Sequence, residues 1–163
     1  MIIELKNKNT LIFDGFKFKC CIGKNGLSRD KKEGDFKTPK GIFRLGTLYY
    51  RTDRIRFPSI KPKSKRIKKT MGWCNDPENK YYNKEIIIKK NIKHEKLYRN
   101  DYKYDCLIVI EYNTEKITPY KGSAIFIHLT KNYKPTAGCI AVKKNDFLVL
   151  IKLISKDAKI RIC

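Results

Sequence analysis

The sequence predicts a mostly β fold with one helix near the C-terminus. Apolar and polar residues alternate with a period of two over residues 16–20 (FKFKC), as in a half-buried strand. The run 106–112 is apolar, rich in Ile and Val, and free of Gly and Pro, which is typical of a central strand. One segment, 145–154, has the apolar spacing of a helical face. With 163 residues, we expect a single domain, 1–163.

The strands follow from short local patterns. Residues 2–5 and 10–13 flank Asn7-Lys8-Asn9, which predicts a hairpin. Further strands are predicted, in chain order, at 16–22, 41–46, 85–88, 106–112, 124–128, 139–142 and 159–162.

The other segments carry turn and loop signals. Residues 23–40 contain several Gly residues and a Pro, so we expect a long loop there. The stretch 51–82 is polar, basic and rich in Pro, Asn and Tyr, which indicates a loop-rich excursion. A short turn of helix is expected over 94–99, and Asn145 is a candidate cap for the C-terminal helix.

The charge balance points to an anionic partner. The chain has 38 Lys+Arg against 16 Asp+Glu, a formal net charge of +22. Heavy use of lysine throughout the chain explains this excess equally well. A basic β domain that binds single-stranded nucleic acid is therefore an alternative, with the Tyr-rich excursion as its stacking platform. Against it, the excess is mostly lysine and no RNA-binding-module or helix-turn-helix signature is present.

No membrane or metal-binding pattern is evident. The apolar run 107–110 is far shorter than the roughly 18 residues of a spanning helix. The first residues do not resemble a signal peptide. The six cysteines include no CxxC pair, and a zinc site built from Cys74, His94, His128 and Cys139 would lack the usual ligand spacing. We expect neither metal nor cofactor.

A cysteine and a histidine lie at the ends of two predicted strands. His128 ends one apolar strand and Cys139 begins another after ten intervening residues. A hairpin would bring them side by side, as a thiol nucleophile and its base require. Their proximity would lower the thiol pKa and raise that of the imidazole. The alternative is a buried structural cysteine and a solvent-facing histidine.

The residues before Cys139 fit the same interpretation. Gly138 has no Cβ, so a substrate carbonyl could approach the backbone there. Amides around Gly138 and Cys139 could then stabilise an oxyanion. Thr136 could fix the loop through its hydroxyl.

Three segments of the chain resemble a known family. Residues 122–128 (GSAIFIH) and 135–142 (PTAGCIAV) are similar to the active-site region of the L,D-transpeptidase catalytic domain (YkuD-like) family. Residues 32–43 (KEGDFKTPKGIF) resemble its upstream EGDxxTPxGxF signature. Shorter segments resemble one branch of that family: 72–77 with 82–83, and 98–101 with 104–105.

The resemblance implies a YkuD-like β-sandwich or barrel-like fold and a cysteine acyltransferase that cross-links peptidoglycan stem peptides through a thioester. By position, Cys139 is the nucleophile, His128 its base and Gly138 part of the oxyanion region. It also implies reaction with carbapenems, roles in cell-wall biogenesis and cell shape, and a periplasmic or cell-envelope location. An L,D-carboxypeptidase or amidase using the same site with water remains open.

One position departs from the family motif. The common pattern is Ser/Thr-His-Gly-Cys, and here Ala137 precedes Gly138, so the second imidazole of the motif is missing. We interpret this substitution as a feature of the branch of the family that the shorter segments resemble.

Four further residues are weaker substrate-binding candidates. Arg99 could hold a substrate carboxylate, although an ion pair with Asp101 or Asp105 is the alternative. Trp73 could wall the cleft or pack in the core. Tyr82 and Thr136 complete the set, and His94 is expected to be structural.

Overall fold

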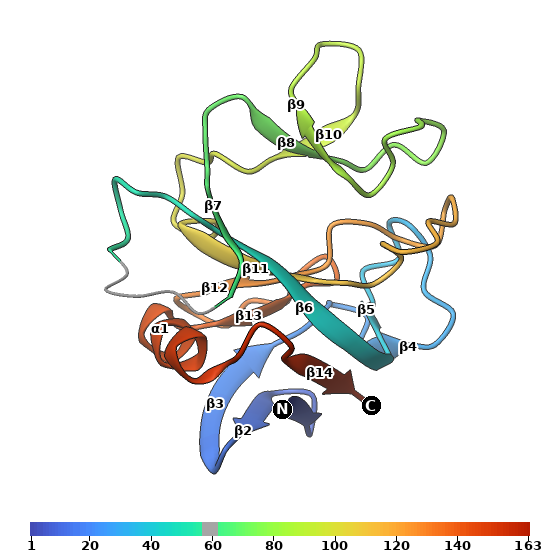
Figure 1. The fold of residues 1–163 in the computed structure, drawn as a ribbon. Coiled ribbons are helices and arrows are strands. Elements are labelled where there is room, and N and C mark those ends of the chain that lie inside the picture. Colours follow the sequence, from blue (N-terminus) through green and yellow to red (C-terminus); the bar gives the residue numbers. More distant parts are fainter. Residues whose placement is uncertain (57–61) are drawn as a thin grey trace.

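The computed structural model describes residues 1–56 and 62–163. Within this part of the chain strands dominate and one α-helix is present, which confirms the mostly β prediction (Figure 1). Of the predicted excursion at 51–82, residues 57–61 lie outside the described residues.

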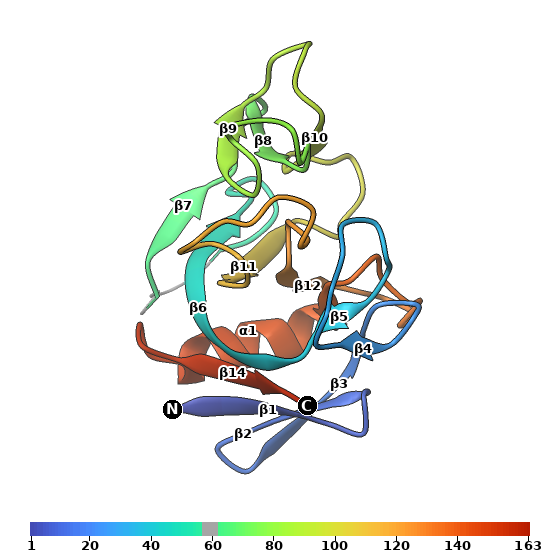
Figure 2. The same ribbon diagram turned by 90° about the vertical axis from the view of Figure 1, so that its right-hand side faces the viewer.

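The chain begins with an antiparallel meander. β1 (Ile2–Lys6), β2 (Thr10–Phe13) and β3 (Phe16–Cys21) pair in sequence order, which confirms the predicted hairpin. β14 (Lys159–Ile162) lies parallel to β1, so both ends of the chain meet in one sheet (Figure 2).

The sheet closes on itself through β6 (Gly41–Tyr50). The first half of β6 pairs with β14 and the second half with β11 (Cys106–Ile110). β11 continues through β12 (Phe126–Leu129) and β13 (Ile140–Val142) to β3. Among residues 1–56 and 62–163, the pairings β11-β12-β13-β3-β2-β1-β14-β6 therefore return to β11, which makes the architecture barrel-like.

Two apolar clusters lie on opposite faces of β12 and β13. The first includes Ile127 and Ile140 and receives the apolar face of α1 (Lys144–Leu153), which buries Phe147, Leu150 and Ile151. The second, on the other face, includes Phe126 and Cys139. A strand points successive side chains to opposite faces, so one strand pair serves both clusters.

The helix is set by packing, and the cap predicted at Asn145 is wrong. The N-cap is Lys143, whose side chain makes no capping hydrogen bond, and Asn145 lies in the first turn. Asp146 near the start and Lys152 near the end suit the helix dipole.

The described part of the excursion is loop-rich, as predicted, and contains two short strands, whereas the predicted helical turn is corrected by the structure. β7 (Ser64–Arg66) lies parallel to β6. β8 (Met71–Cys74), β9 (Glu85–Ile87) and β10 (His94–Lys96) then form a three-stranded sheet that stands above the barrel in both ribbon views. The turn predicted at 94–99 is thus partly strand. β10 is short and polar, so its local sequence pattern does not predict a strand. Its extended conformation is stabilised by antiparallel pairing with β8.

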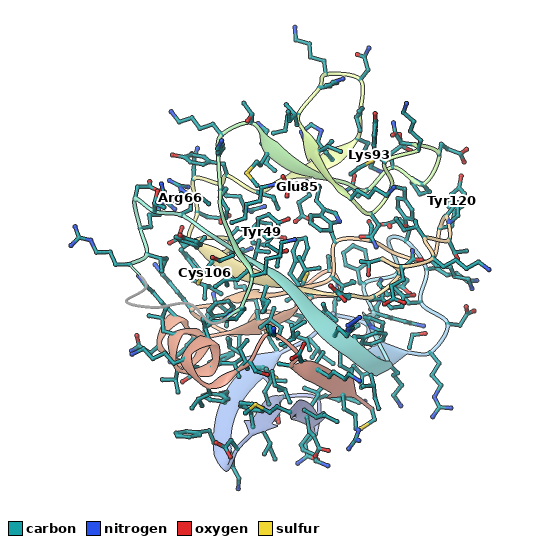
Figure 3. All side chains as sticks on the ribbon, in the orientation of Figure 1. Tyr49, Arg66, Glu85, Lys93, Cys106 and Tyr120 are labelled. Atoms are coloured by element: carbon teal, nitrogen blue, oxygen red, sulfur yellow. The ribbon has the colours of Figure 1, made fainter. Side chains whose placement is uncertain are left out.

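A hydrogen bond joins this sheet to the barrel. The Tyr49 hydroxyl of β6 donates to Glu85 of β9 at 2.6 Å (both are labelled in Figure 3), and Lys65 pairs with the same carboxylate at 2.7 Å. In the expected loop 23–40, β4 (Leu27–Ser28) and β5 (Thr38–Pro39) form a minimal parallel pair.

Candidate active site

The candidate nucleophile and base lie on neighbouring parallel strands, so the predicted hairpin is wrong. Ile127 is opposite Ile140 and His128 is opposite Ala141. One residue back, the Phe126 amide donates to Cys139 Sγ at 3.3 Å, so these two residues also face each other. His128 and Cys139 therefore lie diagonally on one face of the sheet. Standard strand spacings put their Cα atoms about 8 Å apart.

The Cys139 thiol is buried among backbone groups. It donates to the Ala124 carbonyl at 3.2 Å and accepts from Phe126. Within the described residues none of its hydrogen bonds is to His128. Burial first, and the negative charge of Glu95 second, raise the pKa of the thiol to about 12.

The His128 imidazole is neutral and held in one tautomer. Its Nδ1 lies 3.0 Å from the Leu129 carbonyl, which can only accept, so Nδ1 carries the proton and Nε2 keeps a free lone pair. Its ring and that of Tyr104 pack in a T-shaped arrangement, with ring centres 5.3 Å apart. Burial lowers the pKa of His128 to about 4. The expected pKa directions for the pair are therefore wrong, because burial of both groups disfavours their charged forms.

Gly138 needs the backbone freedom of glycine. Its φ is +144°, and a Cβ there would lie 2.9 Å from the Lys37 carbonyl oxygen. Its amide donates to Thr136 Oγ1 at 3.1 Å, and that hydroxyl donates to the Cys139 carbonyl at 2.6 Å. Thr136 thus fixes the loop through its hydroxyl, as predicted.

Residues of the upstream motif, 32–43, hold the loop around Gly138 in place. Thr38 accepts from the Gly23 amide at 2.9 Å and donates to the Gly138 carbonyl at 2.8 Å. Asp35 holds its own turn together, since it accepts from buried Lys31 at 2.7 Å and from two backbone amides. Residues far apart in sequence therefore meet around Gly138.

A cavity of about 470 Å³ adjoins these groups. Cys139, His128 and Gly138 all line it, with Thr136 on its rim. Polar and charged side chains form much of the remaining lining, from the turn around 31–34, from β10 and from the segments 99–104 and 130–136; they include Lys31, Glu33, Asn75, Glu95, Arg99, Lys103, Tyr104, Ser123 and Lys134. The structure thus gathers the predicted catalytic residues in one hollow.

Three predicted substrate-binding residues have structural partners. Arg99 lines the cavity, but its guanidinium holds Asp101 through Nε and Nη2, which is the ion pair weighed against a substrate role. Trp73 lies outside the cavity lining, buried against Phe126 with ring centres 5.2 Å apart. Tyr82 is also buried, and its hydroxyl donates to Glu33.

From the sequence alone, no role was assigned to two residues that lie around the site, Asn83 and Glu95. Asn83 accepts from the amide of Ala124 at 3.0 Å and from Trp73 at 2.9 Å, and so fixes the residue whose carbonyl accepts the hydrogen bond of the Cys139 thiol. Glu95 of β10 accepts a hydrogen bond from the buried Tyr104 hydroxyl. An acidic residue in a short polar strand gives no local signal of such a role.

The described residues contain neither a metal-ligand cluster nor a membrane-spanning helix. Across residues 1–56 and 62–163, no three His, Cys, Asp or Glu side chains gather in a way that could hold a metal ion. The same residues contain no helix of sufficient length and apolarity to cross a bilayer.

The chain is similar to a known family and to a solved structure. The model of the L,D-transpeptidase catalytic domain (YkuD) family matches residues 2–162. No curated protein matches the chain. Among solved structures, the helical cell shape determining protein Pgp2 from Campylobacter jejuni is similar, with a TM-score of 0.51 and 20% identity. The match covers 98% of this chain and 46% of Pgp2, so this chain spans less than half the length of that structure. With a family model that matches nearly every residue, the chain belongs to the L,D-transpeptidase catalytic domain (YkuD) family.

Proposed function

We propose that this chain is a cysteine acyltransferase that acts on peptidoglycan stem peptides at the cell envelope, as an L,D-transpeptidase. The observation that carries the proposal is the shared cavity of Cys139, His128 and Gly138, within a chain that belongs to this family. The net charge of +22 suits an anionic polymer as the substrate.

Acylation would proceed from the neutral pair. His128 Nε2 removes the thiol proton as Cys139 Sγ attacks the carbonyl carbon of the diamino acid in the donor stem. The S–C bond forms, the C–N bond to the terminal D-residue breaks, and the imidazolium returns its proton to the leaving amine. An acceptor amine then attacks the thioester, forms the new amide and releases the thiol. If water attacks, the product is a free carboxylate, as in an L,D-carboxypeptidase.

The oxyanion of the tetrahedral intermediate needs donors beside Cys139. The Gly138 amide already donates to Thr136. We therefore assign the oxyanion to the next amide, that of Cys139 itself, whose approach stays open because Gly138 has no side chain. Thr136 is then a positioning residue that holds the backbone of this turn, more than a direct substrate ligand.

The test is incubation with purified disaccharide-tetrapeptides, followed by mass spectrometry. Cross-linked dimers support transfer, and tripeptides alone support hydrolysis by the same thiol. A carbapenem should add once to Cys139, and Cys139→Ala should show no adduct. If neither product nor adduct forms, the proposed function is wrong.

A further inference from the structure

The catalytic cavity contains a carboxylate that the mechanism above does not use. Glu95 lies on β10, opposite Trp73 of β8, and lines the same cavity as Cys139. Its carboxylate accepts a hydrogen bond at Oε1 from Tyr104. Among the described residues, no hydrogen bond to Oε2 is present and no lysine, arginine or histidine forms an ion pair with Glu95.

Two basic residues of the cavity lining, Lys31 and Arg99, each form an ion pair with another carboxylate. Lys31 pairs with Asp35 at 2.7 Å. Arg99 lies over the Tyr104 ring, 5.1 Å from its centre, but its guanidinium grips Asp101 at 2.5 Å. Among the described residues, the partly buried carboxyl group of Glu95 thus has no ion-pair partner, although the nearby charge of Arg99 partly offsets the rise in its pKa that burial causes. A negative charge at such a carboxyl group is costly unless a partner arrives.

The charge of Glu95 also acts on the nucleophile. It is the second cause, after burial, of the raised pKa of the Cys139 thiol. Burial likewise raises the pKa of Glu95 itself. A cation placed against Glu95 would favour its ionised form and cancel its effect on the thiol, so that binding the right substrate would assist thiolate formation.

We propose that Glu95 binds a primary ammonium group of the substrate, and so selects donor peptides whose side chain at the attacked residue carries a free amine. This inference rests on the proposed function, because the free amine of a diamino acid is the cation that a stem peptide would bring to this cavity. A charge-assisted hydrogen bond to a partly buried carboxylate supplies enough energy for strong selection.

The variant that tests this is Glu95→Gln, with Glu115→Gln as its matched control. Glutamine keeps an oxygen to accept from Tyr104 and removes only the charge. The Glu115 side chain is 81% exposed, and its ion-pair partner is Arg44 at 3.9 Å, away from the cavity. Thermal melts first establish that both variants fold as the wild type does.

The main measurement is kcat/KM for two tetrapeptides that differ only in acetylation of the side-chain amine. The wild type and Glu115→Gln should prefer the free amine by about tenfold or more. Glu95→Gln should lose most of this preference. Equal selectivity in wild type and Glu95→Gln would overturn the inference and leave the proposed function intact.

Two further readouts separate the inference from the proposed function. If the wild type cleaves neither peptide, the proposed function is wrong. The inference is then tested by the affinities of both peptides for Cys139→Ala and for the double variant Cys139→Ala, Glu95→Gln. The inference is supported if Cys139→Ala binds the free-amine peptide more tightly and this preference disappears when Glu95→Gln is added. It is overturned if Cys139→Ala shows no preference for the free amine. Iodoacetamide should also label Cys139 faster at pH 8 in Glu95→Gln, by up to about tenfold for one unit of thiol pKa. An unchanged rate would contradict the coupling of Glu95 to the thiol.

Discussion

The two faces of the β12–β13 pair differ in the interactions that stabilise them. On one face Ile127, Leu129, Ile140 and Val142 are buried in the core with α1. On the other, Phe126, His128, Cys139 and Ala141 face the cavity and the sheet of β8–β10, by the alternation of a strand. The first face needs only apolar volume to fill it. The second depends on individual hydrogen bonds, such as that from Thr38, which is distant in sequence, and that from Thr136 in the same turn. We therefore expect that substitutions on one face of this strand pair change mainly stability, and that substitutions on the other change mainly activity.

The largest effect should follow from removing the thiol. Cys139→Ala should lower kcat by at least about 10⁴-fold, because no other group can form the thioester. Cys106→Ala is the matched control, since Cys106 is buried in the other cluster; it should lose stability by about 1 kcal/mol and stay active. Product formation is followed by mass spectrometry and stability by urea unfolding. Cys139→Ala that yields product at the wild-type rate would end the mechanism.

The next effect should come from the tight turn beside the thiol. Gly138→Ala would bring a Cβ to 2.9 Å from a backbone oxygen at a φ of +144°. The turn must shift, so kcat should fall about 10²-fold and stability by about 1–3 kcal/mol. Gly26→Ala separates the two causes, because Gly26 has a φ of +79° and no atom within 4 Å of an added Cβ. It should keep full activity. Equal losses of kcat in the two variants would mean that strain alone, and not the close approach, matters at Gly138.

On the opposite face the expected effect falls on stability alone. Ile127→Ala should cost about 2–5 kcal/mol, because Ile127 is fully buried in the core cluster. The folded fraction should keep kcat within about twofold. Ile87→Ala, at a site that is 71% exposed, should change stability by less than about 0.5 kcal/mol. These values come from urea unfolding, with kcat measured where each variant is folded. A large loss of kcat in folded Ile127→Ala would show that the faces are coupled.

The sequence alone predicted the first face better than the second. Short apolar runs such as 106–112 and 139–142 located the strands, because burial leaves a local pattern. The motif around Cys139 likewise gave the three groups now found in one cavity. The direction of pairing was not readable, since a ten-residue connection is compatible with a hairpin and with a parallel crossover.

The polar shell around the site was mostly beyond prediction. Nothing local marks Glu95, and although Asn83 and Tyr104 lie in segments that resemble a branch of the family, their hydrogen-bond partners depend on the fold. Trp73 and Tyr82 were substrate-binding candidates, with core packing as the alternative for Trp73, and the structure shows that both are buried and donate hydrogen bonds to side chains of the protein. The pKa directions failed for the same reason, because burial depends on the whole fold.

The smallest expected effect is a pH dependence of stability that belongs to His128. Its pKa is lowered from 6.5 to about 4 in the folded protein, so the unfolded chain binds more protons between these values. The stabilising effect is fully present above pH 6.5 and is lost as the pH falls toward 4. Between pH 7.5 and 5 the wild type should lose about 2 kcal/mol from this group. His128→Gln should not show this loss. The raised pKa of Glu95 acts with the opposite sign but is common to both proteins, so the difference between their urea-unfolding free energies isolates the imidazole. Parallel pH curves for the two proteins would mean that the imidazole is charged when folded, and the neutral pair proposed as the resting state of the site would be wrong.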